Sequence, residues 1–254
     1  MLFRSVGGYR SYWFTYNTDA IPHLTSIASE LGDGTLFTVN YSSGVTLADP
    51  FAGASYGTAT QLHDLVVPGG RSFQLYYNTG SQELSQVTMP FGGTLQWVYG
   101  AKTLAGNRTQ MEVTSRILNA QDGQGNKTYT FTRDDAGDLS RLAHSYTTVQ
   151  DASGAADKSY SFSTAADWKL GLFTALAERK VVSGTPVSTL RSSTATWTQT
   201  ANGNPYVSTT EEVIDPGVTG VEKASRTEQT VDDHGNLLQR KQYGYYTQIG
   251  RAHV

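Results

Sequence analysis

The pentapeptide GASYG at 53–57 has the spacing G-x-S-x-G, in which a nucleophilic serine stands on a strained turn between a strand and a helix. Ser55 would be the nucleophile, and His63, Asp64 and His144 follow it as candidate partners for proton transfer. The fold that uses this motif alternates parallel strands with helices. The sequence shows no such alternation, so we do not expect a hydrolase and interpret Ser55 as part of a Ser/Gly loop.

Three pairs of adjacent acidic residues could in principle supply the two carboxylates of a glycosidase. The aspartates among them open Gly-containing turns, where an Asp side chain accepts hydrogen bonds from the backbone ahead of it. We favour this local role over catalysis. The pairs are Asp134–Asp135, Glu211–Glu212 and Asp232–Asp233.

Other candidate binding motifs are weak. DGQGNKT at 122–128 resembles a phosphate loop but lacks the G-x-x-x-x-G-K-[ST] spacing and a following helix, so it predicts a hairpin turn. The histidines are scattered, and no H-E-x-x-H pair occurs. We therefore assign no catalytic, cofactor-binding or metal-binding residue. The histidines are His23, His63, His144, His234 and His253, and N-x-S/T triplets, relevant only to a eukaryotic secretory context, begin at Asn40, Asn107 and Asn126.

Composition narrows the function classes. Of 254 residues only 16% are charged, the net charge is −3, and Tyr is abundant at 15 residues. This balance is typical of β proteins and gives no basic stripe for nucleic acid. No apolar run approaches the roughly 20 residues that span a bilayer. The absence of Cys excludes disulfides and thiolate metal sites.

A short pattern recurs along the chain, and its period predicts strands. SFQLYY at 72–77 and TLQWVY at 94–99 share a small hydroxyl residue, then alternating apolar and polar positions, then Tyr. In an extended chain such alternation places the apolar side chains on one face. Recurrence at a short period indicates a repeat array. Further copies lie at 11–17, 36–41, 128–133 and 159–164, with similar tails at 24–27 and 84–87.

Turn residues separate these units. Gly supplies positive φ, and Asn or Asp accepts a backbone hydrogen bond, so consecutive hairpins are predicted. At 168–182 apolar residues approach helical spacing, but we favour a strand because a turn follows and 187–200 has the pattern of a returning strand. Turns are predicted at 78–80, 134–138, 150–157, 201–204, 215–217 and 232–236, a loop at 48–60, and Thr-rich strands from 206 onward.

Both ends of the chain have an unusual coding property. MLFRS and IGRAHV can be encoded by opposite strands of one oligonucleotide, whose sequence resembles a common sequencing adapter. We interpret residues 1–5 and 249–254 as translated adapter and exclude them from the fold. We expect the remaining 6–248 to be a single β region from the interior of a longer protein.

VDDHGNLLQRKQYGY at 231–245 resembles the YD-repeat, or RHS-repeat, family, in which Tyr-Asp, a Gly-containing turn, a Leu and an aromatic-x-Tyr recur. RDDAGDLSRL at 133–142 and YNTGSQELSQV at 77–87 are similar. The chain departs from the family at Asn17 and Asn78, which replace Asp, and at Arg133 and Val231, which replace Tyr. The family is found in RHS proteins, insecticidal toxin complexes and teneurins, where its repeats form a hollow β-shell.

The resemblance implies an all-β fold, an open curved antiparallel sheet that is part of a larger shell. It implies a non-enzymatic segment that encloses or displays a C-terminal toxin or effector domain, in a secreted or cell-surface protein. Its partners would be that domain and the flanking repeats, without cofactor. The alternative is an adhesion module that binds carbohydrate or protein through residues such as Tyr76 and Trp97. We favour core packing for the aromatic columns, which include Phe73, Leu75, Tyr77, Trp97 and Tyr99.

Overall fold

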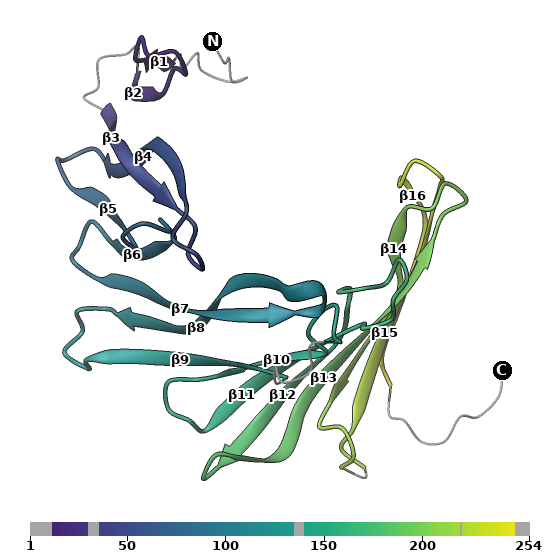
Figure 1. The fold of residues 1–254 in the computed structure, drawn as a ribbon. Helices are drawn as coiled ribbons and strands as arrows, with labels where there is room; N and C mark the ends of the chain where they lie inside the picture. Colours follow the sequence, from purple (N-terminus) through teal and green to yellow (C-terminus); the bar gives the residue numbers. More distant parts are fainter. Residues whose placement is uncertain (1–11, 30–35, 135–139, 219, 247–254) are drawn as a thin grey trace. The chain divides into compact units, whose positions relative to one another are not determined.

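The computed structural model describes residues 12–29, 36–134, 140–218 and 220–246 (Figure 1). These residues form one open antiparallel sheet of 16 strands that pair in sequence order, with β1 and β16 at its edges. The predicted all-β fold is confirmed. The chain divides into two compact units: unit 1 contains residues 1–101 and 115–128, and unit 2 contains 102–114 and 129–254. The adapter-like ends lie outside the described residues.

Nearly every predicted strand is present. Within 168–182, where a strand was favoured over a helix, the strand occupies Phe173–Val182 and the residues before it form a turn. The strands are β1 (Tyr12–Tyr16), β2 (Leu24–Ser29), β3 (Leu36–Ala48), β4 (Ser55–Val66), β5 (Ser72–Tyr77), β6 (Leu84–Thr88), β7 (Thr94–Leu104), β8 (Arg108–Asn119), β9 (Asn126–Arg133), β10 (Tyr146–Gln150), β11 (Ala156–Phe162), β12 (Phe173–Val182), β13 (Thr185–Gln199), β14 (Pro205–Ile214), β15 (Lys223–Val231) and β16 (Leu237–Tyr246), with a 3₁₀ turn, η1, at Ala105–Asn107.

The prediction of a loop over the whole of 48–60 is wrong. β3 continues to Ala48 and β4 begins at Ser55, so the turn is limited to 49–54. Small residues suggested a loop, but pairing between the two strands extends both of them. The register shifts between Leu47 and Ala48, opposite Gly57, whose φ of +93° fits a bulge that other residues would strain.

One face of unit 1 is apolar. Apolar side chains lie directly opposite one another across groups of three strands, as cross-strand pairs that stabilise a sheet. They are half-buried, because each covers part of its neighbours. The three rows are Phe14–Ile27–Phe37, Val39–Leu65–Phe73 and Leu75–Val87–Leu95. The predicted alternation is therefore present, and Phe73 and Leu75 belong to this apolar face.

The opposite face of unit 1 is polar, and its side chains bond one another. Asn40 Nδ2 donates to Asp64 Oδ1 at 2.6 Å, and Gln96 Nε2 donates to Gln86 Oε1 at 2.6 Å. Both bonds link directly paired positions of neighbouring strands. The polar face thus satisfies much of its own hydrogen bonding.

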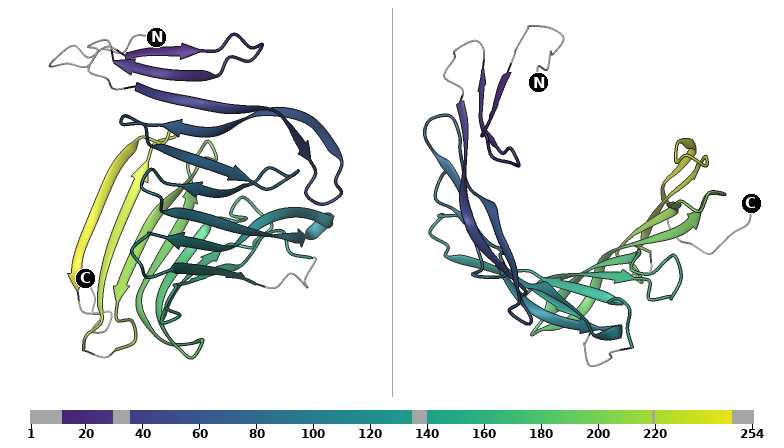
Figure 2. Two further views of the ribbon diagram at one scale, coloured as in Figure 1. Left: turned by 90° about the vertical axis from the view of Figure 1, so that its left-hand side faces the viewer. Right: turned by 45° about the horizontal axis from the view of Figure 1, so that its top comes forward.

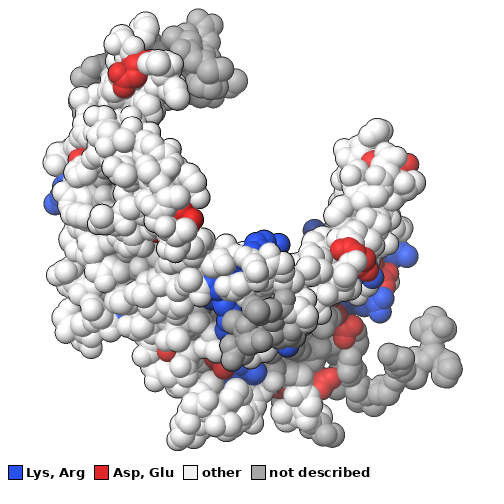
Figure 3. Space-filling model, viewed as in Figure 1, with Lys and Arg blue, Asp and Glu red and all other residues white. Residues whose placement is uncertain are grey.

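Each unit is a single layer. No helix or second sheet covers the described strands in any of the views (Figures 1 and 2). Few described side chains are consequently buried: apolar Leu104 (4% exposed), Val181 (4%) and Ala224 (0%), and charged Asp134 (4%) and Asp157 (7%). Charged groups are sparse over unit 1 and more frequent over unit 2 in the view of Figure 3.

The Tyr that closes each repeat in unit 1 has a structural role. Tyr77 OH donates to Leu62 O, and Tyr99 OH donates to Leu84 O, both at 2.8 Å and both across 15 residues of sequence. Leu62 and Leu84 each lie at a register shift with the preceding strand. A bulge interrupts the backbone ladder. The next strand therefore supplies a side-chain donor to the carbonyl at the bulge.

Tyr41 repeats this arrangement. Its hydroxyl donates to Leu24 O at 3.0 Å, and Leu24 lies at the register shift between β1 and β2. Burial raises the pKa of Tyr77, and burial together with the charge of Glu83 raises that of Tyr99. The hydroxyls of Tyr77 and Tyr99 therefore remain protonated donors at neutral pH.

Unit 2 uses the same arrangement with different donors. Trp197 Nε1 donates to Phe173 O at 2.6 Å, and Gln229 Nε2 donates to Val207 O at 2.8 Å. Phe173 and Val207 lie at the register shifts of the β11–β12 and β13–β14 pairs. The donor is thus an indole or a carboxamide in unit 2 where unit 1 uses tyrosine.

Candidate functional site

Ser55 is not part of a nucleophile elbow. It begins β4, and its Oγ accepts a hydrogen bond from Gly57 N at 3.2 Å. His63 lies eight positions later on the same strand, about 25 Å away at strand spacing, and its Nδ1 is 2.9 Å from Asp64 Oδ2. These groups cannot share a proton with Ser55. The expectation of a loop at Ser55 is wrong, because pairing with β3 makes it a strand residue.

The other predicted motifs lie where local structure uses them. Glu211 and Glu212 are adjacent on β14 and therefore point to opposite faces. Asp232 Oδ1 accepts from His234 N (2.9 Å) and Asn236 N (2.8 Å), which confirms its turn role. Hydrogen bonds from Asn236 and His234 lower the pKa of Asp232.

DGQGNKT is a hairpin turn, as predicted, between β8 and β9. Asp122 Oδ1 accepts from Gln124 N at 3.0 Å, and Lys127 Nζ lies 3.3 Å from Asp122 Oδ2. Its only cation is therefore already paired with a carboxylate, which disfavours phosphate binding.

A cluster of charged side chains, half-buried around the buried Asp134, lies between β8, the end of β9 and the segment before β10. His144 bridges two carboxylates, with Nδ1 2.9 Å from Asp134 Oδ1 and Nε2 2.8 Å from Glu112 Oε1. Arg133 Nε is 3.3 Å from Glu112 Oε2, and Arg141 pairs with Asp134 Oδ2. The cluster brings together residues from three separate segments of unit 2.

Asp134 is the centre of this cluster. Besides His144 and Arg141, it accepts hydrogen bonds from Ser145 N at 2.7 Å and Ser145 Oγ at 2.6 Å. Burial by itself raises the pKa of Asp134, but the bonds from Ser145 and His144 and the charge of Arg141 together lower it from its usual 3.8 to about 2. Asp134 is therefore ionised at neutral pH.

Glu112 is ionised for similar reasons. Burial opposes its charge, but hydrogen bonds from Gln110 and His144 and electrostatic attraction to His144 and Arg133 lower its pKa. A cavity of about 420 Å³ beside the cluster is lined by Gln110, Met111, Glu112, Arg133, Ala143, His144, Thr147, Phe162 and Gly171. Because both carboxylates and both nitrogens of His144 have partners within the cluster, we interpret it as a clamp that fixes the segment before β10, rather than as a reaction centre.

Sequence reasoning missed this cluster. It assigned Asp134 to a turn and weighed His144 as a partner of Ser55 and as one of the scattered histidines. The remainder of the predicted turn, 135–138, lies outside the described residues. Glu112 carried no sequence signal, because its partner His144 is 32 residues away.

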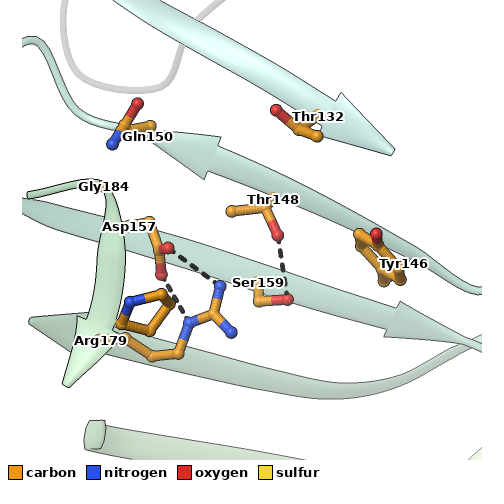
Figure 4. A pocket seen from close by; sticks show the side chains of 9 residues that line it. Thr132, Tyr146, Thr148, Gln150, Asp157, Ser159, Arg179 and Gly184 are labelled. Atoms are coloured by element: carbon orange, nitrogen blue, oxygen red, sulfur yellow. Dashed lines mark hydrogen bonds and ion pairs between the residues drawn. The ribbon is translucent and has the colours of Figure 1, made fainter. Parts of the chain in front are cut away.

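A second cavity of about 390 Å³ lies on one face of unit 2 (Figure 4). Side chains from β9 to β12 line it, together with Gly184 in the β12–β13 turn and Pro186 near the start of β13. Two cross-strand rows form it: Thr132–Thr148–Ser159, and Gln150–Asp157–Arg179. Tyr146 adds an aromatic ring that is 39% exposed.

The charges of this cavity cancel. Arg179 Nε and Nη2 donate to the two oxygens of buried Asp157 at 2.7 and 2.9 Å, a bidentate fork. Figure 4 shows this fork beside Thr148 Oγ1, which donates to Ser159 Oγ at 3.3 Å. The cavity therefore presents polar but neutral groups.

The aromatic residues proposed for recognition do not converge. Tyr76 is 44% exposed, and its hydroxyl donates to Gln74 Oε1 at 2.9 Å on the polar face of unit 1. Trp97 follows Leu95 by two positions on β7 and so lies on the apolar face. One ligand cannot stack on both rings.

Comparison with protein-family models and with curated proteins finds no match to this chain. The resemblance to the YD-repeat family therefore depends on the motif residues themselves. In the described ranges no three His, Asp or Glu residues gather in a way that could hold a metal ion. The same ranges contain no helix with the length and apolar character that crossing a membrane requires.

Proposed function

We propose that this chain is a non-enzymatic structural segment, part of a β-wall that encloses or displays a toxin or effector domain. The observation that carries the proposal is the single-layer sheet of unit 1, whose apolar face is only half-buried. A sheet with one apolar face normally packs that face against another layer. A wall segment would find that layer in its cargo or in flanking repeats of the same polypeptide.

Several further features support a structural role. The closing residues Tyr41, Tyr77 and Tyr99 are used to complete the hydrogen bonding of the sheet. Ser55 accepts a hydrogen bond from the backbone of Gly57, and Asp232 accepts two backbone hydrogen bonds within its own turn. The motif resemblance to the YD-repeat family suggests the same role and a secreted or cell-surface location.

The association state of the 254-residue chain tests the proposal. With its apolar face uncovered, the wild-type chain should self-associate in light scattering and bind a hydrophobic dye. Leu75→Lys, on the apolar face, should reduce both association and dye binding. Gln86→Lys is the matched control. Gln86 lies on the neighbouring strand β6 but on the polar face, so this change should alter neither association nor dye binding. A wild-type chain that is monomeric, melts sharply and binds no dye would contradict the proposal.

A recognition module is the second candidate. Tyr76 and Trp97 lie on opposite faces of unit 1, so they do not support recognition of one ligand. The polar cavity beside Tyr146 is the observation that favours this second function.

A further inference from the structure

The cavity of Figure 4 has free hydrogen-bonding groups, unlike the polar face of unit 1. Among the described residues, the hydroxyls of Thr132 and Tyr146 and the carboxamide of Gln150 have no protein partner. Arg179 uses Nε and Nη2 for Asp157, which leaves Nη1 available. Donors and acceptors from adjacent strands thus surround one space.

The cavity is also held rigid. Asp157 is 7% exposed, and its fork fixes the Arg179 guanidinium against the sheet. Cross-strand pairing sets the spacing of Thr132, Thr148 and Ser159. A ligand would therefore lose little affinity to ordering of the protein groups.

The chemistry of the lining selects the ligand class. Asp157 neutralises Arg179, and no second cation lines the cavity, so the site offers an anion little electrostatic attraction. Hydroxyls, a carboxamide and one guanidinium nitrogen match a ligand with several hydroxyl groups, and the half-exposed ring of Tyr146 can cover an apolar ring face. The volume of about 390 Å³ lies near the lower end of the roughly 300–1,000 Å³ of ligand sites.

Tyr146 and Gln150 lie four positions apart on β10, about 13 Å at strand spacing, which is longer than one sugar ring. We propose that this cavity is a binding site for a neutral disaccharide, with one ring stacked on Tyr146 and the rest of the ligand hydrogen-bonded by Thr132, Gln150 and Arg179. The site is separate from the wall function and does not depend on it. A wall segment could carry the site on its surface, and a recognition module could use it as its main contact.

Saturation-transfer NMR on the 254-residue chain tests the site, with the methyl glycosides of cellobiose, lactose, maltose and N,N′-diacetylchitobiose as probes. We expect transfer to at least one of them. Tyr146→Ala and Gln150→Ala should each weaken that binding at least about fivefold, as expected for one stacking contact or hydrogen bond. Both residues line the cavity without contributing to the Asp157–Arg179 fork, so the fold should persist, and circular dichroism checks it.

Tyr76→Ala is the matched control, because this Tyr is similarly exposed but lies on the polar face of unit 1. It should leave saccharide binding unchanged. Absence of transfer to all four glycosides would overturn the proposal, and so would binding that survives both cavity variants or that disappears in the Tyr76→Ala control. None of these outcomes depends on the association state that tests the wall function.

Discussion

The two units solve the same structural problem with different side chains. Both contain register shifts at which a neighbouring strand donates to a backbone carbonyl. Unit 1 uses tyrosine hydroxyls, such as Tyr77 to Leu62 O, whereas unit 2 uses Trp197 and Gln229. The position of the donor relative to the bulge is the shared feature, and its chemical identity is not.

The units differ more in their polar groups. In unit 1, residues such as Gln86 and Gln96 bond one another in an exposed or half-buried ladder. In unit 2, charges are buried in the Asp134 cluster and in the Asp157–Arg179 fork. Burial of a charge makes its partners indispensable, so single substitutions should destabilise unit 2 more than unit 1.

The largest effect is expected at Asp134. Asp134→Asn removes a charge that holds Arg141 and His144, and leaving such groups unpaired should lower the free energy of unfolding by about 3 kcal/mol. Asp64→Asn is the corresponding change in unit 1, where the carboxylate is 17% exposed, and should cost about 1 kcal/mol or less. Urea denaturation measures both. Equal losses would remove the proposed difference between the units.

The second largest effect is expected when acid protonates Asp134 in the same cluster. Because the folded-state pKa of Asp134 is about 2, below its usual 3.8, its ionised form stabilises the fold above pH 4, and that contribution is lost as the pH falls toward 2. The difference corresponds to roughly 2 kcal/mol. Urea midpoints measured across this range should fall less steeply in Asp134→Asn than in the wild type. Parallel curves would show that another carboxylate governs acid unfolding.

The bulge donors should have intermediate effects of similar size in both units. Tyr77→Phe and Gln229→Met each remove one donor from a carbonyl and should each cost about 1 kcal/mol. Tyr76→Phe, which removes a hydroxyl bonded only to Gln74, should cost less than half of that. Thermal or urea unfolding can compare the three. A loss at Tyr77 no larger than at Tyr76 would mean that the bulge carbonyls do not need these donors.

The smallest effect is expected at an exposed ion pair. Lys158 Nζ lies 2.7 Å from Glu178 Oε1, but the two side chains are 53% and 30% exposed. Lys158→Gln should change stability by no more than about 0.5 kcal/mol. The adjacent cross-strand pair, Asp157–Arg179, is more buried. Asp157→Asn should therefore lower the free energy of unfolding several times more than Lys158→Gln does. Urea unfolding can measure both variants. Because both pairs lie in unit 2, a clear difference would show that the burial of a pair, and not the unit that contains it, sets the loss of stability.

Much of the fold was predictable because its signals are local. Alternation in SFQLYY required a strand, and Asp232 with Gly235 required a turn, since each feature depends on residues a few positions apart. The Tyr donors also left a trace, because Leu62 and Leu84 each precede their tyrosine by 15 residues. The stretch at 48–60 was misassigned because small residues permit a loop, whereas pairing with β3 stabilises a strand.

By itself, the sequence determined the strands, most of their turns and the alternation of apolar and polar positions, because backbone geometry fixes these within a single hairpin. The tertiary structure decided where the bulges fall, which carboxylates His144 bridges, and that Tyr146, Gln150 and Arg179 surround one cavity. These features join residues from different strands through register, and register is set by the pairing of the whole sheet rather than by any one segment.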